Sequence, residues 1–135
     1  RYIEYLKNLS KRCGVENRVK FLGLVSEQDL VALYNQASVF VLAAPKEDFG
    51  MVPVEAMACG SPCVAWGDNT GPSETIVDSI TGFLAKPYDL EDLAQKIKKA
   101  INKNWNRKLI SHYAKRFSER KQRQIFLSYI KNLNF

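Results

Sequence analysis

Short apolar runs and amphipathic segments alternate along most of the chain. Continuous runs at residues 38–43 and 62–66 are typical of parallel strands that are covered on both faces. A shorter run at residues 82–85 predicts another strand, and the alternating pattern over residues 19–23 predicts one more. We therefore expect about four strands.

Segments with helical spacing lie between and around the predicted strands. Apolar residues recur at this spacing over residues 2–13 and again over residues 90–101. Ser26, followed by Asp29, resembles a capping box at the start of a further helix. Helices are also expected at residues 50–58, 71–77, 109–117 and 118–133.

The order of these elements predicts an α/β fold, because strands that alternate with helices form βαβ units and a parallel sheet. We expect a Rossmann-like sheet with helices on both faces. The chain opens with a helix, however, and doubly wound nucleotide-binding domains have about six strands. The first strands are therefore expected to be missing, and the start at Arg1 rather than Met indicates a piece of a longer protein.

Composition narrows the class of protein. The chain has 135 residues, of which 46% are hydrophobic and 25% charged, as in a single globular domain. No apolar run approaches the roughly 20 residues that span a bilayer, and there is no signal peptide, so we expect a cytoplasmic location. An odd number of cysteines without framework spacing indicates a reducing compartment. We expect all three thiols to be buried and to bind no metal: Cys13, Cys59 and Cys63.

Charge is unevenly distributed along the chain. Residues 1–95 carry 8 basic and 13 acidic side chains, whereas residues 96–135 carry 12 basic and 1 acidic. The helical stretch at residues 105–135, called the basic tail below, suits an anionic lipid surface, a nucleic acid or an acidic partner domain; the alternative is a solvated helix surface. No motif with interleaved aromatic residues supports nucleic acid. His112, the only histidine, lies in this tail and receives no catalytic role.

Two carboxylates bracket a predicted strand-to-helix junction. Glu47 and Glu55 lie eight positions apart, directly after one predicted strand, with Gly50 between them. Open α/β sheets bind ligands where strands end, and the free N–H groups of a helix start favour an anion there. The carboxylates then suit hydroxyl groups on either side, as in a sugar, a diphosphate and a ribose. The alternative is an ordinary solvated loop acid and an acid that favours the helix dipole.

Several sequence blocks around this junction resemble one known family. The chain resembles the C-terminal domain of retaining GT-B glycosyltransferases, in particular the glycosyltransferases group 1 family, with a core at residues 18–101. The blocks occur in family order: Val19-Lys20-Phe21-Leu22-Gly23, Glu47-x7-Glu55, Ala56-Met57-Ala58-x-Gly60-x-Pro62, Gly71-x-x-Glu74 and Thr81-Gly82-Phe83-Leu84.

The resemblance implies roles for individual residues. Glu47 is expected to contact the hydroxyls of the transferred sugar as the catalytic residue, and Glu55 to bind the ribose diol. Glu74 is expected to line the same cleft. Backbone N–H groups that hold sugar or diphosphate oxygens are implied at Phe49, Gly50 and Met51. The side chains of Phe49, Met51 and Met57 are expected to pack against the protein rather than to contact the ligand.

The implied activity is transfer of a sugar from a UDP- or GDP-sugar to a hydroxyl acceptor in carbohydrate or polysaccharide biosynthesis, with retention and without a metal or other cofactor. The sequence around Glu47 resembles that of mannosyl-transferring members of the family, which suggests GDP-mannose as the donor. The Arg and Lys that open the family's domain, and its N-terminal acceptor domain, are absent, so this piece alone is expected to be inactive. The alternative is a binding module for nucleotide sugars that performs no transfer. Lipid-linked acceptors in the family make the basic tail a candidate for peripheral contact with anionic membrane.

Overall fold

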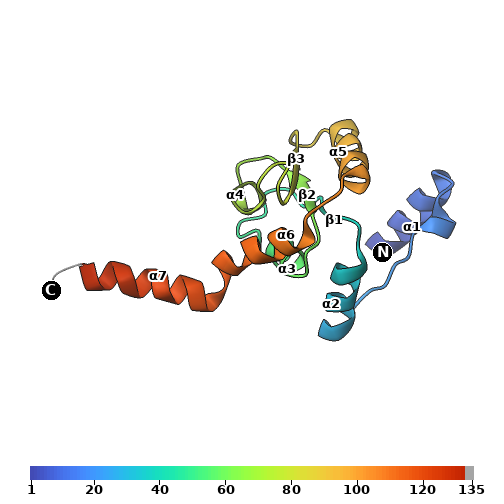
Figure 1. Cartoon of the computed structure of the whole chain (residues 1–135). Coiled ribbons are helices and arrows are strands. Elements are labelled where there is room, and N and C mark those ends of the chain that lie inside the picture. Colours follow the sequence, from blue (N-terminus) through green and yellow to red (C-terminus); the bar gives the residue numbers. More distant parts are fainter. Residues whose placement is uncertain (133–135) are drawn as a thin grey trace.

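The computed structural model describes residues 1–132 and has the predicted α/β architecture, with helices on both faces of a parallel sheet (Figure 1). The sheet contains β1 (Phe40–Leu42), β2 (Cys63–Trp66) and β3 (Gly82–Ala85) in the order β1-β2-β3. All pairings are parallel, and Val64 in the central strand lies between Val41 and Phe83. The three apolar runs identified in the sequence therefore form the sheet.

The described helices account for most of the remaining chain. Ser26 caps the second one as predicted, since its hydroxyl accepts a hydrogen bond from the N–H of Asp29 at 3.1 Å. The predicted helix at residues 118–133 is α7, which ends at Asn132; Leu133 lies outside the described residues. The helices are α1 (Tyr2–Arg12), α2 (Glu27–Gln36), α3 (Met51–Ala58), α4 (Gly71–Thr75), α5 (Leu90–Asn102), α6 (Arg107–Ala114) and α7 (Glu119–Asn132), with 3-10 turns η1 (Glu16–Arg18) and η2 (Lys115–Phe117).

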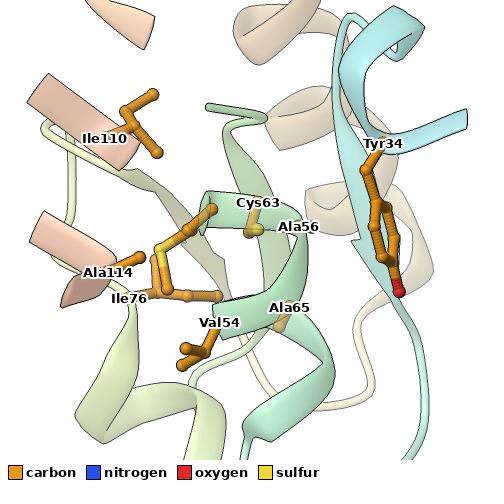
Figure 2. Packing of buried hydrophobic residues seen from close by; sticks show 9 residues of the cluster. Tyr34, Val54, Ala56, Cys63, Ala65, Ile76, Ile110 and Ala114 are labelled. Atoms are coloured by element: carbon orange, nitrogen blue, oxygen red, sulfur yellow. The ribbon is translucent and has the colours of Figure 1, made fainter. Parts of the chain in front are cut away.

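Side chains of the central strand alternate between two apolar clusters. Val64 and Trp66 point toward α5, where they join Phe83 and Leu93. Cys63 and Ala65 point to the opposite face, which α3, α4 and α6 cover. Figure 2 shows this second cluster, in which residues from α3, α6 and β2 converge. Burial of β2 on both faces explains why its sequence is continuously apolar.

The strand predicted at residues 19–23 is wrong. Val19 has extended backbone angles (φ −112°, ψ 125°), but no described segment runs beside it to accept and donate ladder hydrogen bonds. An extended segment becomes a strand only when a neighbour satisfies its N–H and C=O groups. Leu22 is consequently 54% exposed.

Three buried cysteines were predicted, but only Cys63 is fully buried. Cys63 is buried in β2, and this burial raises the pKa of its thiol. Cys59 is half-buried, and Cys13 is exposed because it follows α1, which lies away from the sheet (Figure 1). Among residues 1–132, no helix combines the length and the apolar character that crossing a bilayer requires.

Candidate functional site

The loop that follows β1 enters α3 at Gly50. Gly50 has a left-handed backbone (φ 59°, ψ 26°), which glycine adopts without steric cost. No side chain caps the start of α3, so the N–H groups of Met51 and Val52 in its first turn are left for another acceptor. Pro53 has no N–H to contribute at the next position. The start of α3 therefore favours negative charge.

This loop is closed against the segment that follows β2. The N–H of Gly71 donates a hydrogen bond of 2.8 Å to the carbonyl oxygen of Glu47. A Cβ on Gly50 would lie 2.6 Å from the carbonyl carbon of Gly71, so the two backbones touch with no room for a side chain. The loop carrying Glu47 is thereby fixed to the start of α4.

Asp68 joins the loops that follow all three strands. One oxygen accepts hydrogen bonds from the Lys46 N–H at 3.2 Å, after β1, and from the Tyr88 hydroxyl at 3.1 Å, after β3. The other accepts from the hydroxyl of Thr70 at 2.5 Å and from its N–H at 3.3 Å. The Thr70 hydroxyl bond, together with those from Lys46 and Tyr88, holds the pKa of the Asp68 carboxyl below its usual range.

Trp66 supports the same edge of the sheet from within. Its indole N–H donates to the carbonyl oxygen of Ala43 at 3.0 Å, and its ring lies 5.8 Å from that of Tyr88. Trp66 is buried, as expected for the last residue of the run at residues 62–66, which was predicted to be a strand covered on both faces. The carboxyl ends of β1, β2 and β3 are thus tied into one rim, the position where α/β sheets bind ligands.

The three predicted carboxylates come from neighbouring elements around this rim. Glu47 is half-buried in the loop after β1, Glu55 is exposed on α3, and Glu74 is exposed on α4. The Gly71–Glu47 hydrogen bond joins the first loop to α4, and α4 packs against α3. The fold therefore gathers the elements that carry Glu47, Glu55 and Glu74 at the start of α3.

Glu55 also borders a cleft between α2 and α3. Burial raises the pKa of the Tyr34 hydroxyl, and the adjacent Glu55 carboxylate raises it further. The phenol thus stays neutral beside the carboxylate. The cleft has a volume of about 410 Å³ and is lined by Glu27, Leu30, Val31, Tyr34, Glu55, Ala58 and Cys59.

The packing roles expected for three apolar side chains are wrong in two cases. Phe49 is 80% exposed and Met51 is 46% exposed, because they lie at the loop tip and at the open start of α3. Met57 is fully buried, as predicted. The sequence reasoning also missed the links from Asp68 to Lys46 and Tyr88, which no motif marks. Within the part of the chain that is described, no three His, Cys, Asp or Glu side chains are placed to hold a metal ion.

The chain is similar in fold to solved structures of GT-B glycosyltransferases. The apo form of the lipopolysaccharide outer core galactosyltransferase WaaB aligns over 96% of this chain with a TM-score of 0.83 and 24% identity, a likeness of fold. Anabaena HepE in complex with UDP-glucose aligns over 98% of this chain with a TM-score of 0.75 and 30% identity. The chain corresponds to 37% of each of these proteins.

Sequence similarity gives the family. Residues 2–123 match the family model of the glycosyl transferases group 1, and the chain belongs to this family. It is 36% identical over 107 residues to the alpha-1,3/1,6-mannosyltransferase ALG2 of Dictyostelium discoideum, covering 79% of this chain and 25% of that protein. It is 38% identical over 91 residues to mannosylfructose-phosphate synthase of Agrobacterium fabrum, covering 67% of this chain and 20% of that protein. The chain thus spans about a quarter or less of the length of these curated relatives.

Proposed function

We propose that this chain is the donor-binding part of an enzyme that transfers a sugar from a nucleoside diphosphate to a hydroxyl acceptor. The uncapped start of α3, set between Glu47 and Glu55 at the carboxyl edge of the sheet, carries the proposal. It offers an anion site between two acceptors for hydroxyl groups. Similarity to HepE, whose structure holds UDP-glucose, supports a nucleotide-sugar donor.

Each of the site residues is assigned to a different part of the nucleotide sugar. The N–H groups around Phe49, Gly50 and Met51 hold diphosphate or sugar oxygens. Glu55 accepts hydrogen bonds from the ribose diol at the side of the α2–α3 cleft, and Glu47 accepts them from the hydroxyls of the sugar. Glu74 lines the same space from α4. Each carboxylate can accept two hydroxyl hydrogen bonds, and such charge-assisted bonds are the stronger kind.

The chemistry needs stabilisation of the leaving diphosphate. As the bond between the sugar and the diphosphate breaks, negative charge grows on the phosphate oxygens beside the start of α3, whose free N–H groups stabilise it. We propose retention of configuration, no requirement for a metal, and a separate acceptor domain, in line with the family resemblance. Mannose from GDP-mannose is the finer proposal, supported by similarity to the mannosyltransferase ALG2.

The basic tail adds a second proposed contact, with anionic membrane. The first turns of α7 carry Arg120, Lys121 and Arg123, and its later turns expose Phe126 and Tyr129, at 63% and 68%. Basic side chains beside exposed aromatic ones suit an anionic lipid surface. α7 leads away from the sheet (Figure 1), and these side chains are exposed.

Calorimetry on the 135-residue chain with UDP, UDP-glucose and GDP-mannose tests donor binding. Because Glu55 is proposed to bind the ribose, Glu55→Gln should weaken the binding of UDP, UDP-glucose and GDP-mannose alike. Glu47→Gln should weaken only the additional affinity that the sugar provides. Losing a hydrogen bond to a charged group corresponds to roughly 10- to 100-fold.

The matched control is Glu91→Gln, which removes one exposed carboxylate from the first turn of α5, outside the site. Unchanged affinities in both site variants would remove the assignment. Release of UDP from UDP-glucose or of GDP from GDP-mannose, measured with the donor that binds more tightly after this chain is joined to its acceptor domain, separates an enzyme from a module that only binds. Binding without turnover favours the module.

A further inference from the structure

The backbone of the dipeptide Lys46-Glu47 is held at both ends by one short segment. The Lys46 N–H donates to the Asp68 carboxylate, and the Glu47 carbonyl accepts from the Gly71 N–H. Both partners belong to residues 68–71, directly after β2. Thr70, within the same segment, donates its hydroxyl and N–H to the other oxygen of Asp68. The segment therefore grips the backbone on either side of Glu47.

Backbone strain concentrates at this grip. Among residues 1–132, four residues other than glycine have a left-handed backbone, and three of them lie around Asp68: Lys46, Asn69 and Tyr88, with φ of 52°, 60° and 63°; the fourth is Ser79, at 65°. Asparagine adopts this conformation readily, but Lys and Tyr side chains disfavour it by about 1–2 kcal/mol per residue, so at Lys46 and Tyr88 it persists only where surrounding contacts enforce it. Lys46 and Tyr88 each donate a hydrogen bond to Asp68, and Asn69 is its chain neighbour. Both strained positions thus bond to one carboxylate.

We infer that Asp68 is a positioning residue, whose carboxylate fixes the backbone at Lys46 and so sets where the neighbouring Glu47 side chain points. Without that carboxylate, the Lys46 N–H has no partner from the segment after β2, and its strained backbone can relax. Glu47 then loses its fixed direction, while the start of α3 and Glu55 remain in place. The contact between Glu47 and the donor sugar rests on the proposed function, whereas the effect of Asp68 on the backbone of Lys46 does not.

Amide hydrogen exchange of the chain without ligand tests the grip itself. Asp68→Ala should lower protection at the N–H groups of Lys46 and Gly71 by about tenfold or more. Asp68→Asn should restore most of it, because one amide oxygen can still accept from Lys46 and Tyr88, and the amide NH₂ can donate to the Thr70 hydroxyl. The control is Asp78→Ala, since Asp78 is exposed and, among residues 1–132, its carboxylate accepts a hydrogen bond from the Ser79 hydroxyl alone.

The difference in affinity between a nucleotide sugar and its free nucleotide tests the consequence for Glu47, measured with UDP-glucose and UDP, or with GDP-mannose and GDP if the chain prefers that donor. Asp68→Ala should lower the affinity for UDP-glucose by about tenfold while leaving that for UDP within about twofold. A general loss of structure would weaken both ligands alike and would overturn the positioning role. Rescue of the difference by Asp68→Asn supports it.

The two readouts separate the possible failures. Unchanged exchange at Lys46 and Gly71 in Asp68→Ala overturns the inference, whatever the chain binds. Altered exchange with unchanged preference for UDP-glucose overturns the link to Glu47. Failure of the unaltered chain to bind UDP-glucose and GDP-mannose alike overturns the proposed function, and the exchange experiment then still decides whether Asp68 holds the loop.

Discussion

Gly50 and Gly71 lie backbone against backbone, with no space for a side chain on either. A Cβ on Gly50 would lie within 2.8 Å of three backbone atoms of Gly71 and Pro72, and a Cβ on Gly71 would overlap Gly50 N. This contact joins the loops after β1 and β2 at the start of α3. It depends on two glycines 21 positions apart, of which only Gly50 also needs a left-handed backbone.

Alanine at these positions should open the rim and destabilise the fold. Gly50→Ala combines left-handed strain with a clash against backbone, and Gly71→Ala produces the clash without a left-handed φ. The matched control is Gly14→Ala, because Gly14 has φ 65° and nothing within 4 Å of its Cβ position. We expect Gly50→Ala to reduce the free energy of unfolding by about 1–3 kcal/mol more than Gly14→Ala, measured by urea denaturation. Equal losses of stability in Gly50→Ala and Gly14→Ala would show that the backbones of Gly50 and Gly71 are not in close contact.

Arg107 should stabilise the packing of α2 on the rest of the domain. Its guanidinium donates to the carbonyl oxygens of Ala37 at 2.9 Å and Asn35 at 3.0 Å, at the end of α2. Arg107→Ala should lower the free energy of unfolding by about 1.5–3 kcal/mol, the usual value for hydrogen bonds to a charged group. Lys108→Ala removes one neighbouring exposed charge and serves as the control. Arg107→Lys should recover only part of the loss, since an ammonium lacks the planar fork.

The parts of the fold that the sequence predicted are those with a local signature. β2 is buried on both faces, so its residues are apolar without interruption, and the predicted and observed strands differ by one residue. The segment at residues 19–23 has an extended pattern as well. Whether it forms a strand depends on a neighbouring strand to pair with, and the local sequence pattern does not show whether one is present.

The site was predictable in outline only. The strand-to-helix junction and Gly50 have clear sequence signals, but Asp68 acts on Lys46, 22 positions away, and on Tyr88, 20 positions away. One of these partners is a backbone N–H, which every residue except proline has. Arg107 was read as one charge of the basic tail, whereas it bonds to carbonyls about 70 positions earlier. Such pairings follow from the tertiary fold rather than from residue type.

Acid should weaken the ties made by Asp68. Hydrogen bonds lower its pKa in the folded chain, so its carboxylate adds stability above the ordinary aspartate value of about 3.9, and this contribution is lost as the pH falls through the lower, folded-state pKa. The stability advantage of the unaltered chain over Asp68→Asn should therefore be constant near neutral pH and shrink below about pH 4. Urea denaturation at a series of pH values measures it. An advantage that grows toward acid would contradict the lowered pKa.

Vesicle binding should depend on the charge of α7. We expect the chain to cosediment with vesicles rich in phosphatidylserine more than with phosphatidylcholine vesicles, and less as salt is added, because ions screen the attraction. Replacing Arg120, Lys121 and Arg123 with glutamine should reduce binding by roughly 100-fold, at about 1 kcal/mol per charge.

Replacing three exposed cations of α1 gives the matched control, since it removes the same charge from another helix: Lys7, Lys11 and Arg12. If charge on α7 is what contacts lipid, the α1 variant keeps most of its affinity although its net charge equals that of the α7 variant. Equal losses in the two variants would mean that net charge alone attracts the chain. Equal binding of the unaltered chain to neutral and anionic vesicles would exclude electrostatic attachment through α7 altogether, because a basic helix gains nothing from an uncharged surface.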